Sequence, residues 1–195
     1  MKDEYELRVM EEERKLLRIF IAIEMPDEVI AEVARVQEVL SGQKFTGKMT
    51  ELENLHVTLK FLGEIDEKKM EEVRELLQSV KFEAFEARLM RAGTFSIRGM
   101  PHIVWIKIGG KGIFELQKKI DAALEGLFTR EIRFMSHLTI ARVKYVADKG
   151  RFKEYVRNIG VNGVHFSLKE FCLKKSELKP LGPVYYEIEK YAADQ

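Results

Sequence analysis

The stretch "LHVTLKFLGE", residues 55–64, decides how the rest of the chain is interpreted. Its apolar and polar side chains alternate with a period of two, which predicts a β-strand with one buried face. His56 and Thr58 share the opposite face, two residues apart. A strand that presents an imidazole and a hydroxyl side by side predicts a polar site along that face.

The same pattern appears again in "SHLTIARVK", residues 136–144, where His137 and Thr139 share one face of a second predicted strand. An isolated His-x-Thr pair means little, because a polar residue on a half-exposed strand is common. Two such pairs in a chain with four histidines are a strong signal. The alternative interpretation is that each histidine is an ordinary polar residue on a half-exposed strand face. His165 is expected to be such a surface residue, and His102 opens a strand without a threonine partner.

The segments around the two motifs also repeat in order. Aligning Ile19 with Ile103, His56 with His137 and Phe85 with Phe166 gives offsets of 84, 81 and 81 residues. Each copy has the pattern strand, helix, strand, helix, strand, which predicts an internal duplication with halves at roughly 18–97 and 98–176. Because helices interleave with strands and many connections are short, we expect an α+β fold with an antiparallel-rich sheet in each lobe.

Composition narrows the classes of function. The chain has 195 residues and a net charge of +1, which argues against a protein that coats long duplex nucleic acid. A single cysteine, Cys172, indicates a reducing compartment and is expected to be a half-buried strand residue. Residues 1–17 are charge-rich, lie outside the repeat and are predicted to be an N-terminal extension without a secretory signal. The sequence therefore favours a cytoplasmic protein with no membrane span.

The residue types at the two motifs favour acid–base chemistry over metal or nucleophile chemistry. Zinc sites usually show patterns such as H-E-x-x-H, whereas each histidine here is followed by a hydroxyl, so no metal and no other cofactor is expected. The chain has no G-x-S-x-G motif for a serine nucleophile. Two histidines with ordinary pKa values near neutrality can give and take a proton. Two threonine hydroxyls can donate to an anion between them, so the pattern predicts phosphodiester chemistry.

These motifs resemble the two H-x-T-x motifs of the two-histidine phosphoesterase superfamily, and specifically the RNA 2′,3′-cyclic phosphodiesterases, historically called 2′-5′ RNA ligases. The resemblance extends from Arg18 onward and includes "RIFIAIEMP", "MPHIVW" and "SELKPLGPVYYEI". It implies a single bilobal domain, residues 18–195, with pseudo-twofold symmetry, one motif in each lobe and a central cleft.

The resemblance also implies roles for individual residues. His56 would protonate the departing 3′ oxygen, His137 would activate water, and Thr58 and Thr139 would bind the non-bridging oxygens. Arg142 should bind the phosphate. By the same family pattern Phe61 should line the pocket.

Regular strand alternation turns both Phe61 and Arg142 away from the histidines. Either a β-bulge restores their orientation or the two residues are structural.

The implied substrates are RNA ends or small nucleotides that carry a 2′,3′-cyclic phosphate, and the expected state is a monomer. The resemblance also implies reversible 2′-5′ RNA ligation, in which a 5′-hydroxyl replaces water and two RNA ends are joined. Two alternatives stay open: a phosphodiesterase for another 2′-5′ or cyclic nucleotide, and an RNA- or nucleotide-binding module without catalysis. A further set of cations downstream of His137 is a candidate RNA-binding surface. Its members are Arg142, Lys144, Lys149, Arg151, Lys153 and Arg157.

Overall fold

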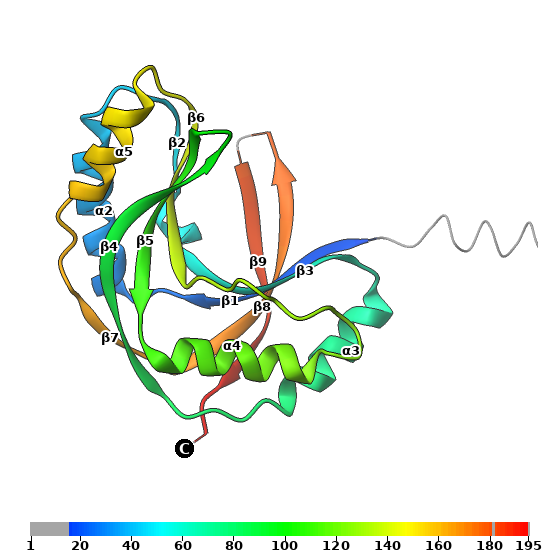
Figure 1. Ribbon diagram of the computed structural model, residues 1–195. Helices are drawn as coiled ribbons and strands as arrows, with labels where there is room; N and C mark the ends of the chain where they lie inside the picture. The colour runs from blue at the N-terminus through cyan, green and yellow to red at the C-terminus, as the bar shows by residue number, and fades with distance from the viewer. Residues whose placement is uncertain (1–15, 181, 195) are drawn as a thin grey trace, which may run out of the picture.

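The computed structural model describes residues 16–180 and 182–194, and its strands form two antiparallel sheets (Figure 1). Most of the predicted N-terminal extension, residues 1–17, lies outside the described part; the first strand already begins at Leu17. Four helices in the described residues complete an α+β fold, which confirms the predicted class.

Sheet A has four strands in the order β3-β1-β8-β9. They are β3 (His56–Ile65), β1 (Leu17–Glu24), β8 (Glu170–Lys179) and β9 (Gly182–Ala192). Sheet B has five strands in the order β2-β6-β5-β4-β7. They are β2 (Thr46–Met49), β6 (His137–Tyr145), β5 (Met100–Gly109), β4 (Phe85–Ile97) and β7 (His165–Leu168). Each motif therefore opens a strand of a different sheet.

The helices lie along the outer sides of the sheets (Figure 1). They are α2 (Asp27–Ser41), α3 (Glu67–Gln78), α4 (Lys111–Ala123) and α5 (Lys149–Asn158). Helices α2 and α5 contact sheet B, α4 contacts β3 of sheet A, and α3 packs beside α4. Asp66 caps α3 by accepting a hydrogen bond from the Lys69 amide, as the sequence predicts.

Strand β1 shows how the core is separated from the inner face of a sheet. Ile19, Ile21 and Ile23 are almost completely buried in the apolar core. Arg18 and Phe20 alternate with them and line a cavity on the opposite face. The period-two pattern of "RIFIAI" thus assigns one face of β1 to packing and the other to the cavity.

The third strands of the two halves exchange sheets. Strand β4 ends the first half but pairs with β5, the first strand of the second half. Strand β8 ends the second half but pairs with β1. Each sheet therefore contains the first two strands of one half and the last strand of the other, which makes the two lobes interdependent.

Two predicted elements have different ends in the structure. The alternation in "GVHFSLKEFCL" predicts one strand over residues 163–173, which the structure splits at Lys169: β7 pairs with β4 in sheet B, and β8 continues in sheet A. The predicted helix 112–128 ends at Ala123, and turns that contain Gly126 follow it. Cys172 is completely buried, not half-buried as expected, because β8 is an interior strand of sheet A.

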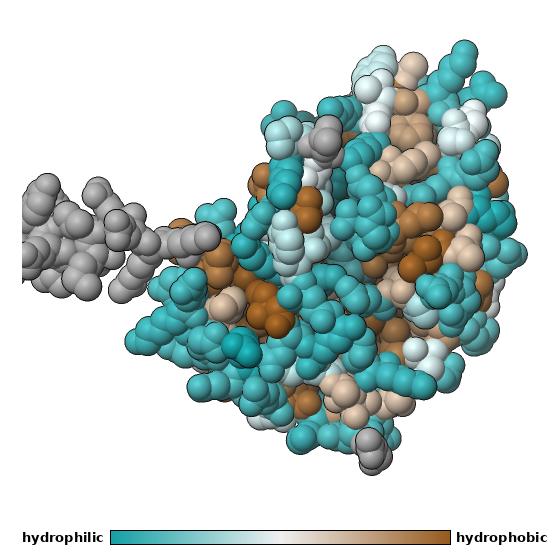
Figure 2. All heavy atoms as spheres, turned by 180° about the vertical axis from the view of Figure 1, so that it is seen from behind, coloured by the Kyte–Doolittle hydropathy of each residue, from teal (hydrophilic) through white to brown (hydrophobic). Residues whose placement is uncertain are grey.

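The surface seen from behind is largely hydrophilic, with hydrophobic patches between the polar side chains (Figure 2). Mixed surfaces of this kind are usual, because folded proteins keep a large apolar share of their accessible area. Within the described part of the chain, every helix is too short or too polar to span a membrane.

Candidate active site

His56 is held in a defined orientation at the start of β3. Its Nδ1 lies 2.8 Å from the carbonyl oxygen of Asn54, in the short 3-10 helix Leu52–Asn54 that precedes the strand. A carbonyl oxygen can only accept, so the ring donates from Nδ1. In the neutral ring Nε2 therefore carries the lone pair, and when charged the same nitrogen can give a proton.

His137 repeats this arrangement at the start of β6. Its Nδ1 donates to the carbonyl oxygen of Met135 at 2.7 Å. In both motifs the acceptor lies two residues before the histidine, so the two rings have the same tautomer. The matched geometry supports a shared chemical role for the two rings.

Both motifs line one cavity of about 660 Å³. The lining includes His56, Thr58, His137 and Thr139. The two strands that carry them, β3 and β6, contact each other across the two sheets. The volume is typical of a pocket for a small molecule or a nucleotide.

Phe61 and Arg142 also line this cavity, because a bulge follows the threonine in each motif strand. In β3 the pairing register with β1 shifts at Leu59, between the Thr58 and Lys60 pairs. In β6 the register with β5 shifts at Ile140. Each shift inserts one residue and reverses the alternation beyond it. Of the two possibilities left open by the sequence, the structure therefore contains the bulge.

The cavity is strongly cationic. Its described lining contains one carboxylate, Glu51, which pairs with Lys48. The lining cations are Arg18, Lys48, Arg142, Lys144 and Lys179. A cleft with this excess of positive charge attracts anions such as phosphates.

The environment lowers the pKa of both histidines. Burial, Lys174 and Arg142 lower the pKa of His56 to about 4, although its bond to Asn54 and nearby Glu24 oppose the shift. Burial also lowers the pKa of His137, against the effect of its bond to Met135. Since the site is cationic, an anion that enters it will raise both values.

Aromatic side chains pack against the imidazole rings of both histidines. Phe20 and Tyr185 each lie 5.1 Å from the His56 ring, measured between ring centres. Phe95 packs edge-on against His137 at 5.0 Å. None of these three residues was predicted from the sequence. The alternation of Arg18 and Phe20 with buried isoleucines is a signal that could have placed Phe20 in the site.

Phe61 offers a flat apolar surface at the rim of the cavity. Its side chain is 52% exposed, although it is large and hydrophobic. The guanidinium of Arg18 lies over the ring, 4.8 Å from its centre. An exposed ring beside a cation is a suitable platform for a nucleobase.

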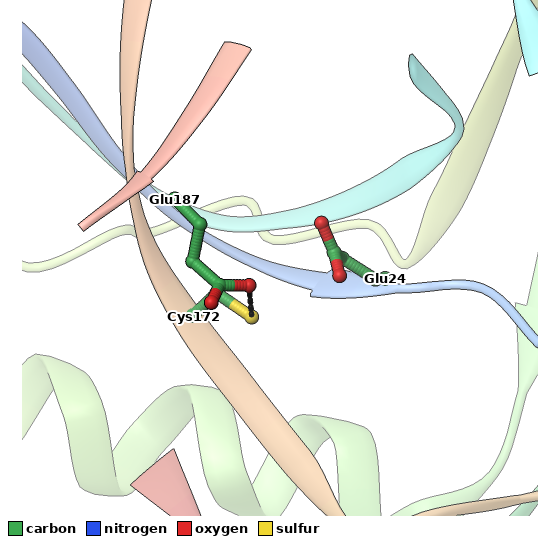
Figure 3. A group of neighbouring side chains, drawn as sticks. All are labelled: Glu24, Cys172 and Glu187. Carbon is green, nitrogen blue, oxygen red and sulfur yellow. Dashed lines mark hydrogen bonds between the residues drawn. The ribbon is translucent and has the colours of Figure 1, made fainter. Parts of the chain in front are cut away.

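Glu24, Cys172 and Glu187 bring three potential metal donors within 4.8 Å of one another (Figure 3). Both carboxylates are already engaged by lysines: Lys174 pairs with Glu24, and Lys190 lies 3.4 Å from Glu187. Burial and the two carboxylates raise the pKa of the Cys172 thiol to about 12. A thiol ligates a metal as the thiolate, so the cluster is poorly suited to a metal ion.

The cations downstream of His137 lie on two elements, β6 and α5. Arg142 and Lys144 line the cavity. Lys149, Arg151, Lys153 and Arg157 lie on α5, which packs against β4 and β5, apart from the described lining. The role of these four α5 cations in holding the RNA strand therefore stays a prediction.

Comparison with known proteins matches nearly the whole chain. A family model described as "LigT like Phosphoesterase" matches residues 23–105 and 108–185. A protein of Methanocaldococcus jannaschii named RNA 2′,3′-cyclic phosphodiesterase is 36% identical over 177 residues, which cover 90% of this chain and 100% of the relative. An Archaeoglobus fulgidus protein of the same name is 35% identical and covers 88% and 98%.

Solved structures share the fold. The protein TT0787 of Thermus thermophilus superposes with a TM-score of 0.78 at 29% identity, covering 90% of this chain and 97% of that one. The E. coli LigT structure in complex with 3′-AMP gives a TM-score of 0.73 at 21% identity and covers 93% and 100%. These likenesses show that the chain shares the fold of these proteins.

Proposed function

This chain belongs to the LigT-like phosphoesterase family, and we propose that it hydrolyses the 2′,3′-cyclic phosphate at RNA ends to a 2′-phosphate without a metal ion. One observation carries the proposal: two His-x-Thr motifs from different sheets line one cationic cavity. The identically oriented rings support a pair of proton carriers. The names of the relatives supply the substrate class.

In the proposed mechanism the phosphorus lies between the two imidazoles. His137 Nε2 takes a proton from water as the water oxygen bonds to phosphorus. The bond from phosphorus to the 3′ oxygen breaks, and His56 Nε2 gives its proton to that oxygen. The product is a 2′-phosphate beside a free 3′-hydroxyl, and solvent exchange restores both rings. Proton transfer by a positioned residue typically contributes about 10²–10⁴-fold.

The remaining residues bind the anion and the nucleoside. Thr58 and Thr139 donate their hydroxyls to the non-bridging oxygens, where negative charge develops in the transition state. Arg142 adds a charge-assisted contact from the rim of the same cavity. Phe61 stacks with a base. If a 5′-hydroxyl takes the place of water as the attacking group and gives its proton to His137, the same groups form a 2′-5′ bond as the 3′ oxygen leaves.

We also propose that residues 18–195 act as one domain that arose from duplicated halves, 18–97 and 98–176. The exchanged third strands support this proposal, since β3-β1-β8 and β6-β5-β4 have equivalent orders. Both halves are needed to build the cavity, so a monomer is sufficient for activity. A single cysteine and an RNA substrate support a cytoplasmic location.

The direct test uses an RNA oligonucleotide with a 2′,3′-cyclic phosphate end and the purified protein in a chelator. We expect complete conversion to the 2′-phosphate, which chromatography separates from the 3′-phosphate. Strict dependence on an added divalent metal would contradict the mechanism. Turnover of cyclic mononucleotides alone would change the substrate class, and binding without turnover of either would favour a binding module.

The pH dependence gives a second prediction. The reaction needs one protonated and one neutral histidine, and the pKa values of both are lowered in the free protein. We therefore expect kcat/KM to fall by roughly tenfold per pH unit above neutrality, because the charged fraction of the acid shrinks while the substrate keeps its charge. Because Arg142 lowers the pKa of His56, Arg142→Ala should move this decline to higher pH.

The measurement is a profile of kcat/KM between about pH 4 and 9. His165→Asn is the control, because His165 is exposed on β7 and should leave the profile unchanged. A rate that stays constant from neutrality to about pH 8 would rule out a protonated histidine in the free enzyme.

A further inference from the structure

The two bulges that turn Phe61 and Arg142 into the cavity are each held by a helix of the other half. The bulge in β6 lies at Ile140, in the second half of the chain. Gln37, on α2 of the first half, donates from Nε2 to the Ile140 carbonyl oxygen at 2.9 Å. The same amide lies 2.7 Å from the carbonyl oxygen of Thr50, another residue of the cavity lining. The Ile140 carbonyl oxygen also accepts from the Thr50 backbone N–H at 2.9 Å, so Gln37 braces the bulge together with the residue that follows the neighbouring strand β2.

The bulge in β3 has an equivalent partner. Lys60, which follows the shift at Leu59, points away from the cavity and pairs with Asp121 on α4 of the second half. Both side chains are nearly completely buried, 5% and 7% exposed. Asp121 also accepts from the Gln117 amide at 2.8 Å and from the Glu131 backbone N–H at 2.9 Å.

The two contacts are related by the same offset as the strands. Gln37 and Asp121 are 84 residues apart, which equals the offset between Ile19 and Ile103. Each lies on the helix that follows the first strand of its half and reaches the motif strand of the other half. The two contacts differ in chemistry. The Gln37 amide binds a backbone carbonyl oxygen, whereas the Asp121 carboxylate binds the Lys60 ammonium, but both contacts occupy the same place in the fold.

We propose that Gln37 and Asp121 are positioning residues: each fixes a bulge across the two halves and thereby keeps Arg142 or Phe61 directed at the substrate. The inference rests on the proposed function, which assigns those two side chains to the substrate. A bulge disrupts the ladder locally, and at Ile140 the Gln37 amide adds a second donor from the other half beside the Thr50 backbone N–H. Without that partner, a shift of one residue towards regular pairing turns every side chain beyond it to the other face.

A small displacement is sufficient to affect the reaction. Misplacement of a catalytic or binding group by about 1 Å can cost on the order of 10²-fold in rate. Loss of the hydrogen bond from Gln37 to the Ile140 carbonyl oxygen should therefore lower kcat/KM, even though Gln37 lies outside the described lining of the cavity.

The test is a double-mutant cycle of Gln37→Met with Arg142→Ala, measured as kcat/KM on the cyclic-phosphate oligonucleotide. Methionine has a similar size but donates no hydrogen bond. We expect Gln37→Met alone to lower kcat/KM by about 10–30-fold and to lower it by less than about threefold further in the Arg142→Ala background. The matched control is Gln78→Met, the same change on the exposed face of α3, which should stay within about twofold of the wild type.

Several results would overturn the inference. If Gln37→Met keeps the kcat/KM of the wild type, Gln37 has no positioning role. An equal loss in both backgrounds means that Gln37 acts on general stability and not through Arg142. The contact between Lys60 and Asp121 is tested by a second cycle. Lys60→Met/Asp121→Leu replaces the buried pair by apolar side chains, and it is measured with and without Phe61→Ala. This second cycle decides the question if Gln37→Met does not fold.

Binding of inorganic phosphate tests the positioning role of Gln37 independently of the proposed hydrolysis. If the wild type does not hydrolyse cyclic phosphates, the proposed function fails. Calorimetry with inorganic phosphate then still reports on the position of Arg142. Binding that is about tenfold weaker in Gln37→Met and unchanged in Gln78→Met would support the positioning role of Gln37. Equal affinity of Gln37→Met and the wild type contradicts it.

Discussion

Replacing either His56 or His137 with alanine is expected to lower kcat/KM by about 10²–10⁴-fold. Each ring donates Nδ1–H to a carbonyl oxygen two residues earlier, which leaves Nε2 for the proton transfer. The pseudo-equivalent geometry gives the two variants losses of similar size. Because the two rings act in one concerted transfer, the double variant should be little worse than either single variant.

Steady-state kinetics on the cyclic-phosphate oligonucleotide measures this loss, and thermal unfolding of each variant tests whether the fold is retained. His165→Ala is the matched control, since this histidine is exposed on β7. The proposed mechanism is untenable if a folded His56→Ala or His137→Ala protein keeps a rate within about tenfold of the wild type.

The sequence was sufficient to predict the strands that carry the motifs and the placement of the two His-x-Thr pairs. Their period-two alternation is a local property, so each His and Thr falls on the same face whatever the partner strand is. The duplicated order of elements likewise predicted the α+β class with a sheet in each lobe. The family comparisons then confirm the resemblance that the motifs indicate.

The orientation of Phe61 and Arg142 could not be predicted in the same way. It depends on one-residue register shifts at Leu59 and Ile140, and neither position is a glycine or has a glycine directly beside it. Long-range partners hold these shifts, such as the Gln37 amide. The exchange of third strands between the sheets is also a tertiary choice, because β4 and β8 have similar local patterns.

The second large effect concerns stability: Lys60→Met is expected to lower the free energy of unfolding by about 3–5 kcal/mol. The change removes the cation but leaves the Asp121 carboxylate buried. In the wild type Asp121 has a lowered pKa, although burial alone would raise it, because Lys60, the Glu131 amide and Gln117 favour the charged form. Without Lys60 the raising effect of burial dominates, so the carboxyl is costly when ionised.

Urea unfolding at several pH values separates this cause from a simple packing defect. In Lys60→Met the Asp121 carboxyl can protonate as the pH falls, so the deficit relative to the wild type should shrink between about pH 7 and 4. In the wild type the pair stabilises the fold above the ordinary aspartate pKa, and this contribution is lost as the pH falls through the lowered pKa of Asp121. A deficit that is independent of pH would assign the loss to packing.

Lys60→Met/Asp121→Leu is the decisive control, because well-packed apolar replacements of a buried ion pair are often neutral or stabilising. We expect the double variant to recover most of the free energy lost in Lys60→Met. Recovery of stability with kcat/KM still below the wild type would show that the pair matters for placing β3 more than for holding the fold. If the double variant is as unstable as Lys60→Met, the cost arises from the lost bonds to Thr129, Gln117 and Glu131 and not from an unpaired charge.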